Sequence, residues 1–212
     1  MGISRAAMRR AAAAVAAADP AFRPVVAKAP LCTIGSGRRE GSHFHSLVKS
    51  VIAQQLSSRA ADTISERLAA VLDHEVTPAT VLALDENLLR EAGLSGAKVR
   101  TIRGLALALH SGELDLDRAV AAADDNYIRT ELQALWGIGR WTVEMFLMFD
   151  LHRLDVWPVG DLAMRRGWQD LHGALGDIEQ KVLEPLGEKF APYRSVAAWY
   201  CWWVVDGEND SW

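Results

Sequence analysis

The sequence predicts an all-α fold, and three observations support this prediction. Apolar residues recur at helical spacing along almost the whole chain, as Leu47, Val48, Val51 and Ile52 do. The alternation that is typical of strands is missing, and the one segment where it could occur, residues 25–34, lies among prolines and glycines that favour a loop. Glycine and proline interrupt the pattern at short intervals, which indicates short helices with short connections. We therefore expect a compact helical bundle without sequence repeats.

The helices expected in the first half of the chain follow from apolar spacing and from helix breakers. The opening segment SRAAMRRAAAAVAAADP contains arginines, but it lacks the serines and the cleavage site of a transit peptide, so we interpret it as a helix. Pro78 begins a short helix, and Gly93 and Gly112 mark the limits of later ones. The expected helices here cover residues 4–18, 43–55, 58–72, 78–83, 86–91 and 97–110.

The second half of the chain is interpreted in the same way. Gly137 and Gly139 interrupt a long apolar pattern, and Pro158 precedes the next helical stretch. The expected helices here cover residues 124–135, 140–149, 161–172, 178–188 and 192–205.

Composition is typical of a globular protein. The chain has 212 residues, of which 50% are hydrophobic and 24% are charged. No uncharged apolar run reaches the ~18 residues that a membrane span needs. Two cysteines, Cys32 and Cys201, are too few for a disulfide framework or a four-cysteine iron–sulfur cluster, so we expect a reducing compartment and no such cluster.

The net charge of −4 argues against a protein that covers nucleic acid through many phosphate contacts, but it allows a narrow basic footprint. Basic residues gather at three places: Lys98 with Arg100 and Arg103, then Arg140, then Arg165 with Arg166. The first group is either a solvated helix face or a set of phosphate contacts, and the sequence leaves both interpretations open.

The stretch ALWGIGRWTVEMF, residues 134–146, places two glycines around one apolar residue. Gly137 and Gly139 allow a tight turn with Ile138 pointing into the core, and we expect both to adopt backbone conformations closed to other residues. Exposed amides at the turn, with Arg140 beside them, would suit a phosphate oxygen. Taken alone, the pattern also fits an ordinary connection between two helices.

Backbone carbonyls in the same turn are candidate ligands for a monovalent cation. The carbonyls of Gln133, Leu135 and Ile138 could gather around Na⁺ or K⁺, as carbonyl rings do in ion sites. We expect such an ion to be structural.

Several stretches, taken together and in order, resemble a known family. LQALWGIGRWTVEMFLMF is followed by DVWPVGDLAMRR, and upstream of them lie FHSLVKSVIAQQLSSRAADTISERL and LREAGLSGAKVRTIRGLALAL. With APYRSVAAWYCWW near the end, these stretches extend over residues 40–206. They resemble the helix-hairpin-helix (HhH-GPD) DNA glycosylases, and within that superfamily the alkylation-repair branch of 3-methyladenine DNA glycosylase II.

The resemblance implies a single glycosylase domain over residues 1–212, built as a two-lobed helical bundle. One lobe would comprise the middle helices, about residues 45–150, with the DNA-binding hairpin at 131–149. The other would combine the two termini, about residues 1–44 with 151–212.

Asp161 occupies the place of the aspartate that the family carries after the hairpin. Pro158 and Gly160 precede it, so we expect it at a helix N-terminus, where the dipole favours an ionised carboxylate. Most aspartates before helices are only caps, but the family pattern implies a catalyst that stabilises an oxocarbenium ion or orients water. We expect it in the cleft between the lobes, and interpret Asp150 and Asp155 as a helix end and a loop residue.

Trp141 stands where strand-cutting members of the superfamily carry a nucleophilic lysine. By this resemblance, water removes the base, the strand stays intact, and no cofactor is required.

A base pocket is the second implication of the resemblance. Trp141 and Trp202 match pocket positions, and Phe44 could face them. Such aromatic faces would attract the cationic rings of 3-methyladenine or 7-methylguanine. Met145 stands where we expect an aromatic residue, which puts the substrate range in doubt. The competing interpretation of tryptophans is core packing, which we prefer for Trp168, Trp199 and Trp203.

By the same resemblance, the segment AQQLSS, residues 53–58, corresponds to the family's wedge loop between two helices, which fills the gap left by an extruded nucleotide. Gln55 or Leu56 is the candidate wedge. The alternative is a plain turn in which Leu56 is buried.

The sequence therefore predicts a monofunctional glycosylase for alkylated purines. Release of deaminated bases such as hypoxanthine or uracil is one alternative, and a helix-hairpin-helix protein that binds damaged DNA without catalysis is another. We expect double-stranded DNA with damaged bases as the partner, no membrane contact, a monomer, and a cytoplasmic location, associated with the nucleoid if the protein is bacterial.

Overall fold

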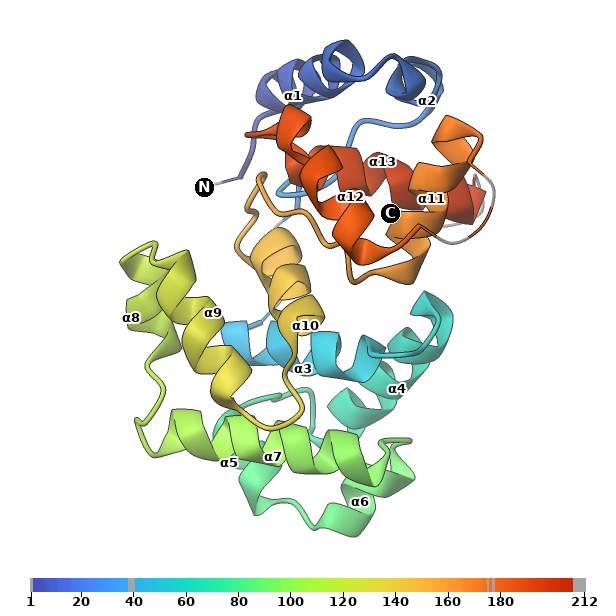
Figure 1. Cartoon of the computed structure of the whole chain (residues 1–212). Helices are drawn as coiled ribbons and strands as arrows, with labels where there is room; N and C mark the ends of the chain where they lie inside the picture. Colours follow the sequence, from blue (N-terminus) through green and yellow to red (C-terminus); the bar gives the residue numbers. More distant parts are fainter. Residues whose placement is uncertain (1, 38–40, 175, 177, 208–212) are drawn as a thin grey trace. The chain divides into compact units, whose positions relative to one another are not determined.

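The computed structural model describes residues 2–37, 41–174, 176 and 178–207. Every regular element in these residues is helical and none is a strand, which confirms the all-α prediction (Figure 1). No helix in the same ranges is long and apolar enough to cross a membrane.

The chain divides into two compact units. Arg39–Phe146 forms the central unit, and Met1–Arg38 with Leu147–Trp212 forms the terminal unit. That residues 1–212 act as one glycosylase domain stays a prediction.

The central unit is a bundle whose helices begin at polar caps. Ser57, Ser95 and Asp124 each accept a hydrogen bond from the first turn of the helix that they precede. Leu47 and Ile102 are fully buried in its core. Helix α7 packs against α3 and α5, and α10 packs against α9 and α3. The helices are α3 (His43–Ala53), α4 (Ser58–Val71), α5 (Pro78–Ala83), α6 (Glu86–Glu91), α7 (Gly96–His110), α8 (Leu116–Ala121), α9 (Asp125–Ala134) and α10 (Arg140–Met145).

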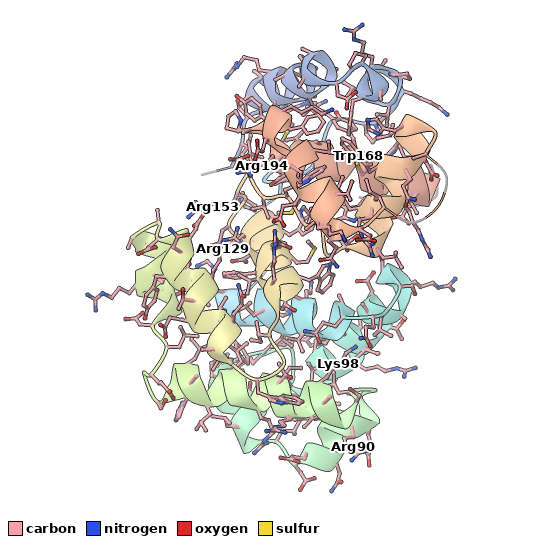
Figure 2. The ribbon with its side chains drawn as sticks, in the orientation of Figure 1. Arg90, Lys98, Arg129, Arg153, Trp168 and Arg194 are labelled. Atoms are coloured by element: carbon pink, nitrogen blue, oxygen red, sulfur yellow. The ribbon has the colours of Figure 1, made fainter. Side chains whose placement is uncertain are left out.

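The terminal unit is organised around the packing of α11 against α13. A Cβ on Gly167 of α11 would collide with the backbone of Cys201 in α13, so glycine is needed for this close approach. An aromatic cluster of Phe22, Trp168 and Phe190, with ring centroids 5.1 to 6.0 Å apart, fills the core beside it. Trp168 is labelled in Figure 2. The elements are α1 (Arg5–Ala18), η1 (Pro20–Phe22), α2 (Arg23–Lys28), α11 (Leu162–His172), α12 (Gln180–Leu186), η3 (Glu188–Phe190) and α13 (Arg194–Asp206).

Two short helices were not predicted from the sequence. Helix α2 overlaps the segment expected to be a loop, and it begins with Pro24 in its first turn. Helix α8 follows the N-cap Asp115. Each has six residues, as do α5 and α6, which were predicted, so length alone does not explain why the sequence analysis missed them.

Three other details differ from expectation. The helix expected over 140–149 is α10 followed by a π-helical turn, η2 (Phe146–Asp150), a local widening that is common at functional sites. The helix expected over 178–188 is the shorter α12. Trp203, near the end of α13, is only half-buried, so its assignment to the core stays a prediction.

Candidate active site

The glycine turn joins α9 to α10 in the central unit. Gly137 has a φ of +81°, and a Cβ there would collide with the Thr101 side chain of α7. Conformation and packing therefore both require glycine at this position. Ile138 is buried, as predicted, and its amide closes the turn by donating to the Leu135 carbonyl at 3.2 Å.

Gly139 differs from Gly137, and the expectation that both adopt a conformation closed to other residues was wrong. Its φ of −95° and ψ of 176° are extended, which any residue can adopt. No heavy atom among the described residues lies within 4 Å of a Cβ built on it. The fold itself does not require glycine here, and the space left open allows a partner's backbone to approach closely.

Arg140 is the first residue of α10, and its guanidinium pairs with a buried carboxylate of the same helix. Its Nε donates to Oε1 of Glu144, one turn later, at 2.7 Å. The Glu144 side chain is buried, whereas the Arg140 side chain is half-exposed. The ion pair offsets part of the positive charge beside the turn.

The loop between α3 and α4 exposes both candidate wedge residues. Gln55 has a φ of +59°, the left-handed conformation that non-glycine residues rarely adopt, and its side chain is exposed. Leu56 is 40% exposed, so the alternative of a plain turn with a buried Leu56 was wrong. The choice between the two residues as the wedge stays a prediction.

Gln54 ties this loop to the glycine turn. Its Nε2 donates to the Gly137 carbonyl at 3.0 Å and to Oγ1 of Thr142 at 2.8 Å. The sequence analysis did not single out Gln54, because nothing in the local pattern indicates partners so far along the chain. The hydrogen bonds hold the candidate wedge loop and the hairpin in one arrangement.

Two of the three basic residues on α7 are used inside the central unit. Nζ of Lys98 donates to the carbonyls of Ile52 and Gln54 at 2.7 and 3.0 Å, which satisfies the end of α3. Burial lowers the pKa of Lys98. Nη1 of Arg103 donates to the Leu84 carbonyl at 3.0 Å. Neither side chain fits the simple solvated face that the sequence left open.

Asp161 is the N-cap of α11 in the terminal unit, as predicted. Its Oδ1 accepts hydrogen bonds from the Met164 amide at 2.7 Å and from Nε1 of Trp202 at 2.8 Å. Trp202 reaches it from α13, directly after the point where Gly167 lies against the Cys201 backbone. The close packing of the two helices therefore sets the orientation of the carboxylate.

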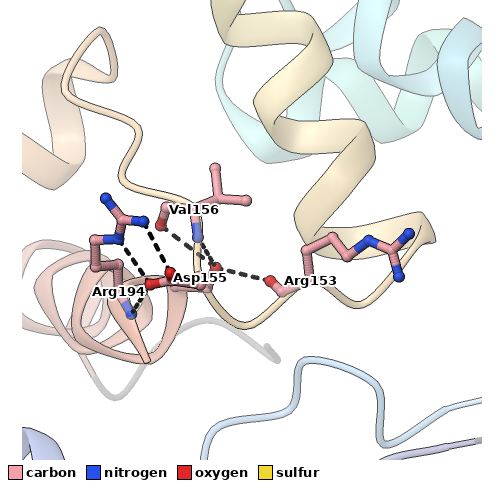
Figure 3. Close-up of polar contacts among 5 residues, drawn as sticks. Arg153, Asp155, Val156 and Arg194 are labelled. Atoms are coloured by element: carbon pink, nitrogen blue, oxygen red, sulfur yellow. Dashed lines mark hydrogen bonds and ion pairs between the residues drawn. The ribbon is translucent and has the colours of Figure 1, made fainter. Parts of the chain in front are cut away.

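The segment that leads to α11 is anchored on the start of α13 (Figure 3). Nε and Nη2 of Arg194 donate to the two carboxylate oxygens of Asp155 at 2.7 and 2.8 Å. These hydrogen bonds hold the pKa of Asp155 below its usual range. The Ser195 hydroxyl donates to the Arg153 carbonyl at 2.7 Å and accepts from the Val156 amide at 2.9 Å. Asp155 is thus a structural loop residue, as interpreted from the sequence.

The side chains expected to line a base pocket are divided between the units. Trp202, in the terminal unit, is buried, and its ring lies 5.7 Å from that of Phe149. Phe149 is 43% exposed and was not singled out from the sequence. In the central unit, Trp141 is half-buried, and Phe44 and Met145 are buried. Their assignment to a pocket stays a prediction.

The carbonyls proposed for a cation belong to the end of α9 and to the glycine turn. Helix α9 ends at Ala134, so the Gln133 carbonyl lies in a last turn that no further helical amides follow. The Leu135 carbonyl accepts from the Ile138 amide and keeps a second lone pair. The cation site on the carbonyls of Gln133, Leu135 and Ile138 stays a prediction. Among the described residues, no group of three or more His, Cys, Asp or Glu side chains is placed to hold a metal ion.

Comparison with known proteins shows relatives over most of the chain. Residues 48–192 match the family model of the HhH-GPD superfamily base excision DNA repair proteins. DNA-3-methyladenine glycosylase 1 of Schizosaccharomyces pombe is 35% identical over 162 residues, which cover 75% of this chain and 71% of the relative. DNA-3-methyladenine glycosylase 2 of Escherichia coli is 25% identical over 166 residues, 77% of this chain and 55% of the relative.

Solved structures show the same fold. The 3-methyladenine DNA glycosylase of S. pombe in complex with abasic DNA has a TM-score of 0.83 at 27% identity, over 96% of this chain and 100% of that chain. A DNA-3-methyladenine glycosidase of Bacillus halodurans has a TM-score of 0.74 at 34% identity, over 91% of this chain and 87% of that chain.

Proposed function

The chain belongs to the HhH-GPD superfamily of base excision DNA repair proteins, and we infer that it is a DNA glycosylase that removes 3-methyladenine and related alkylated purines. The observation that carries this inference is the carboxylate of Asp161, held at the start of α11 by an amide and by the Trp202 indole. The names of the relatives support the same reaction.

We propose that Asp161 acts on the sugar of an extruded nucleotide. When the N-glycosidic bond breaks, its electron pair leaves with the base and the deoxyribose gains positive charge. An ionised carboxylate stabilises that charge or orients the water that attacks C1′ and then loses a proton. An N-alkylated purine is already cationic, so it leaves as a neutral base without a general acid. Deaminated bases are neutral and need more help with departure, which makes them the weaker candidates.

We propose that the enzyme is monofunctional, because Trp141 stands where strand-cutting relatives carry a lysine. An indole cannot form a Schiff base with the sugar, so water is the nucleophile and the product is an abasic site in an intact strand. This reaction needs no cofactor. A structural Na⁺ or K⁺ on the turn carbonyls is part of the proposal, and loss of DNA affinity when choline replaces both ions would support it.

DNA is the partner that the family and its DNA-bound members indicate. We propose that the open space at Gly139 admits a phosphate, that Gln55 or Leu56 fills the gap in the stack, and that the enzyme acts as a monomer on damaged duplexes. A cytoplasmic location stays a prediction.

The test is an excision assay on duplexes that carry methylated purines, hypoxanthine, uracil or no lesion. We expect abasic sites, revealed by alkaline cleavage, in the methylated duplexes first. Borohydride added during turnover should trap no covalent adduct. Preferential release of hypoxanthine or uracil would show that deaminated bases, and not alkylated purines, are the substrates. Tight binding of damaged DNA without excision would show a non-catalytic binding protein.

A further inference from the structure

Arg100 is the basic residue of α7 that the central unit does not use for its own carbonyls. Lys98, labelled in Figure 2, precedes Arg100 by two residues and so lies on a different side of α7, where its Nζ binds the carbonyls of Ile52 and Gln54 at the end of α3. Arg103 is held by the Leu84 carbonyl and pairs with Glu86 at 3.2 Å. Among the described residues, no carboxylate pairs with Arg100, so its charge stays uncompensated at the surface.

The guanidinium of Arg100 lies over the ring of an exposed tryptophan at the glycine turn. Its Cζ lies 4.1 Å from the ring centroid of Trp136, which is 50% exposed and directly precedes Gly137. Thr101, the residue after Arg100, packs against Gly137, the residue after Trp136. This packing holds α7 and the turn close together at the point where Arg100 meets Trp136. Large exposed aromatics are rare on a solvated turn, and burial does not explain this one.

We propose that Arg100 and Trp136 form a clamp for a phosphate of the DNA backbone beside the hairpin. The proposal rests on the proposed function in one respect, that duplex DNA approaches the central unit at the glycine turn. The clamp is a binding site on α7 and the preceding loop, and it needs no contribution from the N-terminus of α10. It reads the phosphodiester backbone and not the damaged base.

The chemistry of a stacked guanidinium supports this site. Stacking on the indole face holds the planar group in one orientation and leaves its N–H edge free for two parallel hydrogen bonds to phosphate oxygens. Because the side chain is held before DNA arrives, less rotamer entropy is lost on binding. Lysine carries the same charge but cannot stack or bind in a bidentate manner, so the site should distinguish the two residues.

The experiment measures binding of an undamaged duplex as a function of salt concentration. Arg100→Gln should weaken binding about fivefold near physiological salt and lower the slope of log K against log salt by about 0.9, the value for one phosphate contact. Arg100→Lys should keep most of the slope but lose part of the affinity. The matched control is Arg118→Gln, which removes an equally exposed arginine from α8.

Trp136→Leu tests whether the two residues act together. The leucine keeps apolar surface but loses the cation–π contact, so binding should weaken. In the double variant Arg100→Gln with Trp136→Leu, the losses should not add, because either change alone removes the clamp. Thermal unfolding should be nearly unchanged in all variants, since both side chains are exposed.

The outcomes separate the clamp from the proposed function. If Arg100→Gln binds with the affinity and slope of Arg118→Gln while the parent protein excises methylated purines, the clamp is wrong and the function stands. If the slope depends on Arg100 but the parent excises nothing, the clamp stands and the function is wrong. Fully additive losses in the double variant would overturn the coupling of Arg100 to Trp136.

Discussion

Helix α11 meets an aspartate at each end, and the protein holds the two carboxylates in different ways. Asp161 caps the first turn and accepts hydrogen bonds from an amide and an indole. Asp19 lies at the other end, where Lys189 and His172 bind its Oδ2 at 2.7 and 2.9 Å and the Ala21 amide binds its Oδ1 at 3.0 Å. Asp19 is buried and caps η1, so a role in stability is enough to account for an aspartate at this position.

The difference shows how a structural carboxylate can be told from a candidate catalyst. Cationic partners at Asp19 form a cluster that stabilises the fold, since an unpaired buried charge would be costly. At Asp161 the helix cap accounts for about 1 kcal/mol of stability, and asparagine would serve that role as well. The cap alone does not require an aspartate at this position, which is consistent with the catalytic role that we propose for Asp161.

The largest expected effect comes from Asp161→Asn. Loss of the negative charge should lower the excision rate about a hundred- to a thousandfold, because the sugar cation loses its stabilising group. The melting temperature should change little, since asparagine is a good N-cap. Single-turnover excision and thermal unfolding would be measured on the same samples. Turnover at the normal rate would show that Asp161 is only a cap.

Asp19→Ala should give the reverse result. Removal of the carboxylate leaves Lys189 and His172 without their shared partner, and should lower the free energy of unfolding by about 2 kcal/mol. The excision rate of the folded fraction should stay within about twofold, because Asp19 is bound at the far end of α11. Urea unfolding and single-turnover kinetics check the two halves of the prediction. A large loss of excision rate with an unchanged free energy of unfolding would show that Asp19 is not a purely structural carboxylate.

The same contrast predicts a dependence on pH. Burial alone would raise the pKa of Asp19, but hydrogen bonds from Lys189 and His172 outweigh it and lower the pKa from 3.8 to about 2. A group with a lowered pKa stabilises the fold above its unfolded pKa, so this stability, about 2 kcal/mol, should be lost as the pH falls from about 4 to about 2. Urea unfolding at pH 6 and pH 3 measures it. In Asp19→Asn, the free energy of unfolding should fall less steeply with decreasing pH below about 4. An unchanged pH dependence would contradict the assignment of this stability to Asp19.

The smallest expected effect comes from Trp202→Phe, which keeps a ring but deletes the N–H that binds Asp161. We expect excision to slow about tenfold, since the carboxylate loses one of the groups that orient it. Trp199→Phe is the matched control on the same helix, because Nε1 of Trp199 is buried without a hydrogen-bond partner in the described structure. Its excision rate should stay near normal. Equal losses in the two variants would show that ring volume matters and the hydrogen bond does not.

Local signals made part of this structure predictable. The Pro158–Gly160 stretch and the helical spacing after it predicted the N-cap at Asp161, and the helix limits mostly agree with the sequence because caps and apolar stripes act within a turn or two. The family resemblance supplied what the local pattern could not, namely the role of that carboxylate.

Long-range polar contacts could not be predicted. Gln54 and Gly137 are 83 residues apart, and Asp19 and His172 are 153 apart, yet each pair is joined by a hydrogen bond. Such contacts leave no periodic trace in a single sequence, unlike apolar faces. For the same reason, the sequence left Lys98, Arg100 and Arg103 as either a solvated face or phosphate contacts, although two of them bind carbonyls inside the central unit.

Gly139 has a consequence for variant libraries of this protein. Alanine fits the backbone angles of Gly139 and meets no neighbour outside the adjacent chain, but it is a poorer N-cap than glycine, so Gly139→Ala should fold about as well as the parent. A screen for expression or heat resistance would therefore tolerate this change, whereas in the function that we propose the new methyl group occupies the space that admits a DNA phosphate. Such a screen alone would not detect variants that fold normally but have lost affinity for DNA.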